Sequence, residues 1–383
     1  MLFTNILSMN VGLLGYGSIA KAHVHAYRDI PVFFPKSNGE IKVKWIFGRE
    51  KQRAENFAKT YGIEKYTTVV DDILKDDSVS IIDNVLPNKY HYELCIRAIE
   101  AGKNVICEKP LALNFKQAVE MYVRAEKQGI VHGVMFNYRF LPAIRLAKKI
   151  INEGMLGKIY HFRAVYLEDF ALDPTSPLVW RYIKSEAGSG SLGDDGSHIV
   201  DMARYLVGEI KRVCGISKIY IKERPMPSNN SKKGYVETDD QFLALLEFEN
   251  NVAGSLEASR VCAGRKNYQY IEINGSEGSL YWNLEKLNEL YLYTVKDGQY
   301  AGFKNIMVTD PLHPYIRNFW PPGSIISWAD SFVIALYEYV NAVSQGKPFE
   351  SNFYDGAANL AVLDAIQRSI EEKRWIEVER MQK

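Results

Sequence analysis

Short apolar runs alternate with amphipathic stretches along the first part of the chain. Apolar positions recur at helical spacing between the runs, as in Ala54, Phe57, Ala58 and Tyr61. The runs themselves read as buried strands, at residues 11–14, 41–47, 79–85, 104–107 and 130–136. Continuous apolar strands are typical of a parallel sheet covered on both faces. The alternation therefore predicts an α/β fold with a doubly wound parallel sheet, whose ligands lie beyond the carboxyl ends of the strands.

The pattern changes after a predicted helix at residues 142–152. Strand-like segments separated by turn signals then dominate, at residues 158–166, 213–222, 239–249, 251–261, 268–274 and 278–282. They predict a large, mostly antiparallel or mixed sheet that is open on one face. Two late helices, near residues 327–344 and 355–372, are expected to flank or cover this sheet, and residues 375–378 are expected to add an edge strand. A chain of 383 residues exceeds what one core usually fills. Two domains are therefore expected, at residues 1–137 and 138–383.

The turn after the first strand carries a chemical signal. Gly15, Gly17 and Ala20 match the G-x-G-x-x-G/A fingerprint of dinucleotide binding. Gly15 supplies the tight turn, Gly17 has no Cβ to block a pyrophosphate, and Ala20 lets the helix lie close to the strand. The N–H groups at the start of the helix then bind the phosphates. An ordinary tight turn is the alternative reading, and the flanking strand and helix patterns favour the fingerprint.

The end of the second predicted strand bears on the choice of dinucleotide. An acidic residue at this place usually binds the ribose hydroxyls of NAD, and a nearby Arg accommodates the 2′-phosphate of NADP. The chain has Gly48 and Arg49 here, and Glu50 comes one position late. NAD and NADP both remain open on these residues.

Composition excludes several classes of partner. Lys and Arg number 47 against 46 Asp and Glu, so the net charge of +1 gives no general attraction to nucleic acid or anionic membrane. No run reaches the roughly eighteen apolar residues that cross a bilayer. The four cysteines show no C-x-x-C spacing and read as reduced packing residues, which together with the absence of a signal peptide predicts a cytoplasmic protein. The seven histidines form no H-E-x-x-H pair, so no metal site is expected.

A second candidate site follows residues 188–190, which read Gly-Ser-Gly. Asp194, His198 and Asp201 are spaced four and three apart, so they share one face of a predicted helix. Gly196 inside that helix costs about 1 kcal/mol. A glycine kept at this cost suggests that something approaches the helix closely. On spacing alone, His198 is equally well a catalytic base or a buried histidine satisfied by a carboxylate.

Taken together, these stretches resemble the glucose-fructose oxidoreductase, inositol dehydrogenase and MocA-type family of NAD(P)-dependent dehydrogenases. The matching stretches span nearly the whole chain: GLLGYGSIAKAHVHAY, VLPNKYH, GKNVICEKPLA, FNYRFLPA, GKIYHFRAVY, WR with GSGSLGDDGSH, and NGSEGSL. Within the family, the chain looks most similar to levoglucosan dehydrogenase-like and glycoside-oxidising members. This finer resemblance rests on three features: the insertion before the second strand, the residues Gly48-Arg49-Glu50 at the end of that strand, and the late stretch LHPYIRNFWPPG.

The resemblance implies a Rossmann domain followed by a larger α/β domain. The open sheet of the second domain would form the substrate floor and the interface of a homodimer or homotetramer. The family lysine of E-K-P maps onto Lys109, and its Asp/His pair of D-x-G-x-H maps onto Asp194 and His198; all three would line the substrate. The usual triple glycine before this pair is Gly-Ser-Gly here, which we read as a mild variation of the loop.

The resemblance also implies a set of contacts to the dinucleotide. Trp180 is alternatively a core aromatic residue, and Arg181 a residue of a surface ion pair. The expected contacts are Gly15, Gly17, Ser18, Ile19, Gly48, Arg49, Pro87, Asn88, His91, Glu108, Lys109, Asn137, Trp180 and Arg181.

The expected reaction transfers a hydride between NAD or NADP and a secondary hydroxyl of a sugar, cyclitol, anhydrosugar or glycoside. His198 is the preferred base, Asp194 orients it or binds a neighbouring hydroxyl, and Lys109 polarises the reacting oxygen. Whether Lys109 or His198 moves the proton stays open. Two alternatives are a glycosidase of the same fold that keeps NAD bound and uses transient oxidation, and a non-enzymatic sensor that binds a dinucleotide. The sensor has no need for the set of Lys109, Asp194 and His198.

Overall fold

The computed structural model describes residues 9–35 and 40–381. These residues form two compact units. The first contains the chain up to Asn137 together with Ser327–Ala357, and the second contains Tyr138–Ile326 and the chain from Ala358 onward. From the sequence, residues 138–383 were expected in one domain, whereas the contacts of the structure group Ser327–Ala357 with the first unit.

A six-stranded sheet forms the centre of the first unit, with the order β3-β2-β1-β4-β5-β6. Every pair of neighbouring strands is parallel, which confirms the doubly wound prediction. The strands are β1 (Met9–Leu14), β2 (Ile41–Phe47), β3 (Lys65–Thr67), β4 (Val79–Asn84), β5 (Asn104–Cys107) and β6 (His132–Val134). The short β3 at the sheet edge was not predicted from the sequence.

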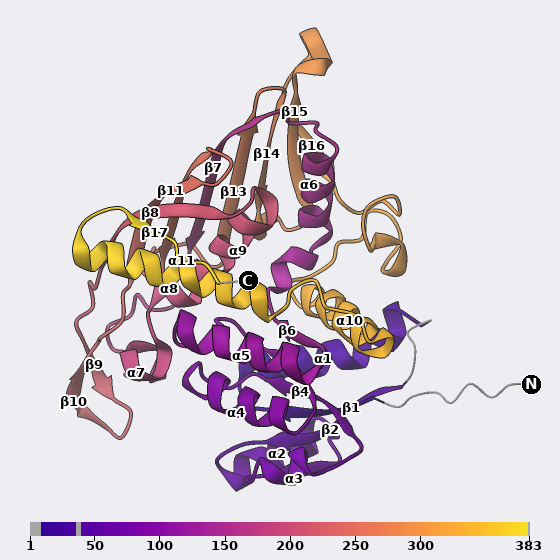
Figure 1. Ribbon diagram of the computed structural model, residues 1–383, viewed down its shortest axis with the longest axis vertical. Helices are drawn as coiled ribbons and strands as arrows, with labels where there is room; N and C mark the ends of the chain where they lie inside the picture. The colour runs from indigo at the N-terminus through magenta and orange to yellow at the C-terminus, as the bar shows by residue number, and fades with distance from the viewer. Residues whose placement is uncertain (1–8, 36–39, 382–383) are drawn as a thin grey trace, which may run out of the picture. The chain divides into compact units, whose positions relative to one another are not determined.

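Helices join the strands of the first unit, as Figure 1 shows. They are α1 (Ser18–Phe33), α2 (Lys51–Thr60), α3 (Asp71–Leu74), α4 (Lys89–Glu100) and α5 (Phe115–Gln128). Helix α5 illustrates the local signals: the side chain of Asn114 accepts a hydrogen bond from the N–H of Gln117 at 3.0 Å, and Gly129 ends the helix in the left-handed conformation.

Helix α10 (Asp330–Gln345) belongs to the first unit, where it packs against α1. The rings of Phe34, just after α1, and Tyr337 stack with centres 3.8 Å apart. The chain after α10 then pairs with β6, where Val134 N donates to Ser351 O at 2.8 Å. The expectation that α10 flanks the second sheet is therefore wrong, because its apolar surface is buried on α1. Helix α11 (Phe353–Glu372) begins in the first unit and continues in the second.

The second unit contains a nine-stranded sheet with the order β16-β15-β14-β13-β7-β12-β11-β8-β17. Its long strands run side by side in Figure 1. Only the β7–β12 pair is parallel, so the sheet is mixed and mostly antiparallel, as expected. The strands are β7 (Ile159–Leu167), β8 (Ile210–Lys218), β11 (Gln241–Phe248), β12 (Ala253–Ser259), β13 (Tyr268–Gly275), β14 (Gly278–Asn283), β15 (Glu289–Thr294), β16 (Lys304–Met307) and β17 (Ile376–Glu377).

The remaining elements of the second unit are short. Strands β9 (Glu223–Met226) and β10 (Asn229–Tyr235) pair only with each other among the described strands. The α-helices are α6 (Pro142–Asn152), α7 (Lys184–Ala187), α8 (Ser191–Asp194) and α9 (Gly196–Leu206). The 3-10 helices are η1 (Asn137–Phe140), which starts at the unit boundary, and η2 (Trp180–Tyr182), η3 (Leu284–Lys286), η4 (Val295–Tyr300) and η5 (Ile316–Asn318).

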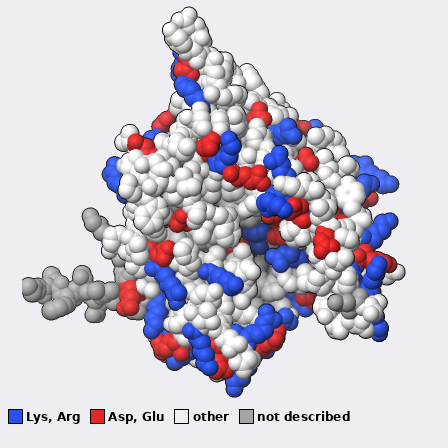
Figure 2. All heavy atoms as spheres, turned by 180° about the vertical axis from the view of Figure 1, so that it is seen from behind, with Lys and Arg blue, Asp and Glu red and all other residues white. Residues whose placement is uncertain are grey.

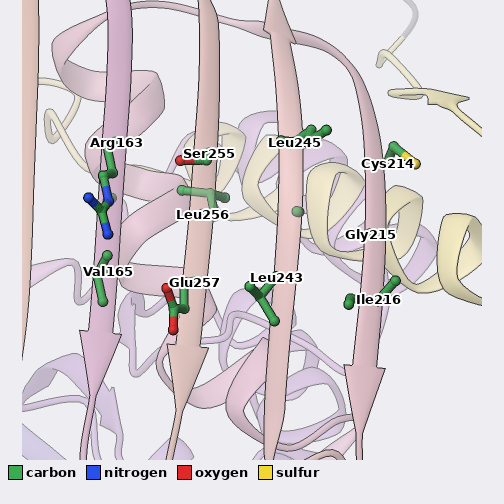
Figure 3. A pocket seen from close by; sticks show the side chains of 12 residues that line it. Arg163, Val165, Cys214, Gly215, Ile216, Leu243, Leu245, Ser255, Leu256 and Glu257 are labelled. Atoms are coloured by element: carbon green, nitrogen blue, oxygen red, sulfur yellow. The ribbon is translucent and has the colours of Figure 1, made fainter.

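The two faces of the nine-stranded sheet differ. Helices α6, α8 and α9 pack on one face, where alternate residues of β11, such as Phe242 and Leu246, are buried. The intervening residues of β11 and its neighbours lie on the opposite face, where Leu243, Leu245 and Ile216 are 38%, 56% and 58% exposed. Figure 3 shows these side chains along β8 and β11. The strand alternation thus produces one core face and one partly apolar open face.

Charged side chains of both signs are mixed over the face seen in Figure 2, in keeping with a net charge of +1. Within residues 9–35 and 40–381, no helix is both long enough and apolar enough to cross a bilayer.

Candidate active site

The turn between β1 and α1 has the backbone that a dinucleotide phosphate needs. Gly15 has a φ of 120°, which favours glycine, and its N–H donates to Phe47 O at 2.9 Å. Apart from Gly17 itself and its two chain neighbours, no described residue has a heavy atom within 4 Å of the place where a Cβ of Gly17 would stand. Helix α1 begins at Ser18 with no capping side chain, and Ile19 follows half-buried. A pyrophosphate can therefore approach the backbone and take the place of a cap.

The end of β2 is lined by aromatic rings. Gly48 is buried beside Tyr16, and a Cβ at this position would overlap the Tyr16 ring. The guanidinium of Arg49 lies 5.1 Å from the centre of the Tyr90 ring and donates to the Tyr90 hydroxyl at 2.7 Å. Glu50 is exposed. Glycine at position 48 is therefore required by the packing of Tyr16.

The segment after β4 contains Pro87, Asn88 and His91. The imidazole of His91 is fully buried, with Nδ1 2.8 Å from Pro110 O and Nε2 2.7 Å from Leu86 O. Burial lowers the pKa of this imidazole below its ordinary value. The imidazole thus joins the segment after β4 to the segment after β5, and the contact of His91 with the dinucleotide stays a prediction.

Glu108 and Lys109 directly follow β5. The Lys109 side chain is half-buried, and its backbone N–H donates to Glu108 Oε2 at 3.1 Å. The other oxygen of Glu108, Oε1, lies 3.0 Å from Nε2 of His23 on α1. Asn137, at the end of the first unit, is buried and donates to Ser331 Oγ at 2.7 Å. Glu108 therefore anchors the backbone that carries Lys109.

The loop before α8 explains the departure from a triple glycine. Gly188 has a φ of 84°, and a Cβ at Gly190 would overlap the backbone of Asp239. Both positions therefore require glycine, the first for its conformation and the second for a close approach. Ser189, between them, carries its side chain without such a requirement. Serine therefore replaces glycine at the middle position, where the structure does not require a glycine.

The carboxylate of Asp239 holds this loop in place. Its Oδ1 accepts a hydrogen bond from Gly190 N at 2.7 Å. Its Oδ2 accepts hydrogen bonds from Ser191 Oγ and Leu192 N, each at 2.8 Å. Since α8 is formed by Ser191–Asp194, these three bonds fix the helix whose last residue is Asp194.

Asp194 and His198 lie in the second unit together with Trp180 and Arg181. Arg181 Nε donates to Asp194 Oδ2 at 3.2 Å, and its guanidinium lies 4.5 Å from the centre of the Trp180 ring. His198 is buried in α9, with its ring centre 4.5 Å from that of Tyr138. The structure thus brings Arg181 to the carboxylate of Asp194.

Two tyrosines whose hydroxyls are linked pack beside His198, with the ring centre of Tyr166 5.9 Å from that of the imidazole. The hydroxyl oxygens of Tyr138 and Tyr166 are 3.0 Å apart, and Tyr166 donates to Asn267 Oδ1 at 2.6 Å. Burial raises the pKa of Tyr166 well above its ordinary value, so this phenol stays protonated at neutral pH. A buried histidine beside linked hydroxyl and amide groups suits the recognition of a molecule rich in hydroxyls.

The helix expected to carry Asp194, His198 and Asp201 is divided, because α8 ends at Asp194 and α9 begins at Gly196. Asp201 is fully buried and accepts a hydrogen bond from Arg139 Nε at 2.8 Å. A Cβ at Gly196 would lie 2.9 Å from the ring of Phe242. The close approach predicted from this glycine is therefore that of a core ring on β11.

The expected dinucleotide contacts of the first unit follow the carboxyl ends of β1, β2, β4, β5 and β6, which are neighbours in the sheet. Sequence reasoning missed three residues that support the expected site: His23, Asp83 and Asp239. Asp83 did carry a signal, because a charged residue inside an apolar strand needs a buried partner.

Two family models match separate parts of the chain. Residues 9–136 match the model of the oxidoreductase family with an NAD-binding Rossmann fold, and residues 144–281 match the GFO/IDH/MocA C-terminal domain. Levoglucosan dehydrogenase of Pseudarthrobacter phenanthrenivorans is 39% identical over 97% of this chain and 98% of its own length. Glucose-6-phosphate 3-dehydrogenase of Bacillus subtilis is 28% identical over 92% of this chain and 94% of its own. A solved structure of levoglucosan dehydrogenase in complex with NADH and levoglucosan has a TM-score of 0.94 at 39% identity, covering 97% of this chain and 100% of that one.

Proposed function

We propose a substrate class for this chain, which belongs to the GFO/IDH/MocA family of NAD-binding oxidoreductases. It is an NAD-dependent dehydrogenase, and its substrate in our proposal is an anhydrosugar of the levoglucosan type or a closely related sugar or cyclitol, oxidised at a secondary hydroxyl. One observation carries the proposal: the 39% identity to levoglucosan dehydrogenase extends over 97% of this chain. The likeness therefore includes the second unit, with Asp194 and His198.

Three side chains carry the proposed reaction. NAD, when bound, accepts the hydride that leaves the substrate carbon. His198 takes the proton of the hydroxyl being oxidised, because an imidazole titrates near neutral pH. Lys109 donates a hydrogen bond to the same oxygen and stabilises the charge that develops there. Asp194, held by Arg181, accepts a hydrogen bond from a neighbouring hydroxyl of the sugar.

The first unit supplies the proposed dinucleotide site. Gly15 and Gly17 let the backbone approach the pyrophosphate, and the first N–H groups of α1, from Ser18 and Ile19, bind it. Gly48 and Arg49 lie at the adenosine end, while Pro87, Asn88 and Glu108 follow the neighbouring strands.

A substrate panel tests the proposal. The purified chain is mixed with NAD or NADP and with levoglucosan, myo-inositol, scyllo-inositol or glucose 6-phosphate, and the growth of the reduced-nicotinamide absorbance is recorded. We expect levoglucosan with NAD to give the highest kcat/KM. Absence of reduction with every sugar, in protein that binds NAD, contradicts the proposal. Release of the alcohol from a chromogenic glycoside without net reduction of NAD indicates a glycosidase instead.

Variants test the assigned residues. Lys109→Ala and His198→Ala are each expected to lower kcat at least a hundredfold, the usual contribution of a positioned acid, base or charge-stabilising donor. Turnover within a few-fold of the unmodified enzyme in both variants contradicts the assignment.

We also propose that the open face of the nine-stranded sheet binds a second copy of the chain. This face forms a shallow hollow of about 530 Å³ that includes Leu243, Leu245 and Ile216. Figure 3 shows Glu257 on β12 next to Leu243 on β11, and Arg163 on β7, one strand farther along the sheet. An apolar area with charges of both signs at its side suits a self-complementary interface.

Light scattering of the purified enzyme tests this association. Leu245→Asp, which places a charge in the apolar area, is expected to reduce the oligomer to a smaller species. Leu312→Asp is the matched control, since Leu312 is 85% exposed and lies outside this face. A monomeric unmodified enzyme, or an oligomer that Leu245→Asp leaves intact, contradicts the proposed interface.

The cytoplasm is the compartment that we propose for this enzyme. All four cysteines are free, with Cys95 and Cys107 buried, which suits a reducing compartment. Fractionation of the producing cells checks this assignment.

A further inference from the structure

A buried histidine lies behind the Glu108–Lys109 pair in the first unit. His23, on α1, has no exposed surface and stands between two carboxylates. Its Nδ1 is 2.7 Å from Asp83 Oδ2, on β4, and its Nε2 is 3.0 Å from Glu108 Oε1, after β5. Tyr27, one helical turn along α1, donates its hydroxyl to the same Asp83 oxygen at 3.0 Å. The ring therefore links three elements of the unit through buried polar contacts.

With Asp83 and Glu108 ionised, both contacts of His23 are hydrogen bonds only if the ring carries two protons. A neutral imidazole has one N–H, whereas an ionised carboxylate only accepts. Burial by itself lowers the pKa of His23, but the charges and hydrogen bonds of Asp83 and Glu108 outweigh it and raise the pKa to about 10. Tyr27, Cys107 and Tyr339 are among the other titratable groups packed here, and burial raises the pKa of each, so these three remain neutral. His91 lies near Glu108, and Cys95 lies beside Cys107. His23 is thus a buried cation shared by two carboxylates.

The bond to Glu108 continues to Lys109. One Glu108 oxygen faces His23, and the other accepts the N–H of Lys109 at 3.1 Å. A carboxylate held at both oxygens cannot rotate, so it defines where the backbone of Lys109 lies. Without His23, Glu108 would be released on one side and could turn toward the Lys109 amine.

We propose that His23 is a positioning residue for Lys109, acting through the Glu108 carboxylate that it binds. This inference rests on the proposed role of Lys109 in the dehydrogenase reaction. No bond of His23 to substrate or NAD is involved; its effect passes through Glu108 alone.

Two substitutions each remove one of the two hydrogen bonds of His23 and keep the other. The amide nitrogen of His23→Asn takes roughly the place of Nδ1, so it still donates to Asp83 but no longer reaches Glu108. The amide nitrogen of His23→Gln takes roughly the place of Nε2, so it keeps Glu108 and loses Asp83. Both remove the positive charge of the ring and both disturb the core. A lower kcat in His23→Asn than in His23→Gln therefore measures the effect of losing the hydrogen bond to Glu108.

The kinetic expectation follows from this comparison. His23→Asn should have a kcat about tenfold or more below that of His23→Gln, with KM values within about threefold, because a small displacement of a catalytic group lowers the rate without weakening substrate binding. Tyr27→Phe is the control: it removes a bond to the same Asp83 and should leave kcat within about threefold of the unmodified enzyme. Equal kcat values for the Asn and Gln variants, measured on folded protein, overturn the proposal. So does a loss in Tyr27→Phe as large as in His23→Asn.

A second measurement needs no turnover. The rate of acetylation of Lys109 by acetic anhydride is followed against pH by mass spectrometry of the peptide that contains Lys109. In His23→Asn the released Glu108 can bind the Lys109 amine, so the labelling profile should move to higher pH than in His23→Gln. Coincident profiles overturn the positioning role. If no sugar is oxidised, the proposed function fails while this comparison still decides the role of His23.

Discussion

Asp239 offers a quantitative test of how the loop before Asp194 is held. Its carboxylate is 8% exposed and accepts three hydrogen bonds from consecutive residues, at 2.7 to 2.8 Å. Asp239→Asn keeps the shape of the side chain but replaces one oxygen with an NH2 group. The NH2 group can only donate. In one orientation of the amide it faces the N–H of Gly190, and in the other it faces the N–H of Leu192. The perturbation is therefore confined to hydrogen bonding and charge.

The loss of unfolding free energy caused by Asp239→Asn can be summed over the three hydrogen bonds. The better orientation keeps the carbonyl oxygen at Oδ2, where it serves Ser191 and Leu192, and leaves the buried N–H of Gly190 without its acceptor, at about 1–3 kcal/mol. The two surviving bonds become neutral rather than charge-assisted, and each weakens by about 1 kcal/mol. We expect a total loss of about 3–5 kcal/mol. For a domain of this size, at about 2–4 °C per kcal/mol, that lowers the Tm by about 6–20 °C.

Thermal and urea unfolding of the purified enzyme measure this loss. Asp173→Asn is the matched control, because Asp173 Oδ1 also accepts a backbone N–H and a hydroxyl, from Thr175 at 2.8 and 2.7 Å, but is exposed. The control should change stability by no more than about 0.5 kcal/mol. If Asp239→Asn costs less than about 1 kcal/mol, or no more than the control, the loop is not held by this carboxylate and the reasoning is refuted.

Three further predictions address the first unit, a buried ion pair and pH. Gly48→Ala should weaken NAD binding about tenfold in calorimetry, because its Cβ would overlap Tyr16; an unchanged Kd would show that the ring moves freely. Arg139→Gln should cost about 3–5 kcal/mol in urea unfolding, since it leaves the buried Asp201 without its cation, and a loss under about 1 kcal/mol would contradict this. The pKa of His23 is raised from 6.5 to about 10, so its stabilisation is complete below pH 6.5 and is lost as pH rises through 10. The unfolding free energy should therefore fall across that range more steeply than in His23→Gln; parallel curves would argue against a buried cation.

Periodicity predicted those parts of the molecule that depend on local pattern. The alternation in β11 places Phe242 and Leu246 in the core and Leu243 on the open face, which is the face-to-face difference expected for such a strand. The turn at Gly15 and the position of Lys109 after β5 likewise follow from short-range signals. These features were predicted because each depends on residues close together in the sequence.

Features that depend on distant residues were not predicted. Helix α10 is apolar on much of its surface, and nothing in its own sequence tells whether it packs on α1 or on the second sheet. The partner of Asp83 was equally hidden, because His23 is separated from it by 60 residues. The close approach at Gly196 was predicted, but the approaching group was not, since Phe242 comes from a distant strand. In each case a contact between residues distant in the sequence decides the structure, and the local pattern of residues does not reveal it.

The return of residues 327–357 to the first unit has a consequence for biosynthesis. Segment 349–353 is built into that unit at β6, where Phe353 N donates to His132 Nδ1 at 3.1 Å and Ser351 Oγ donates to Val134 O at 2.8 Å. The nucleotide-binding unit therefore stays incomplete until residue 357 has left the ribosome. We expect the nascent enzyme to acquire its coenzyme only after that residue has emerged, and a fragment truncated at residue 137 to expose the apolar side of α1 and aggregate.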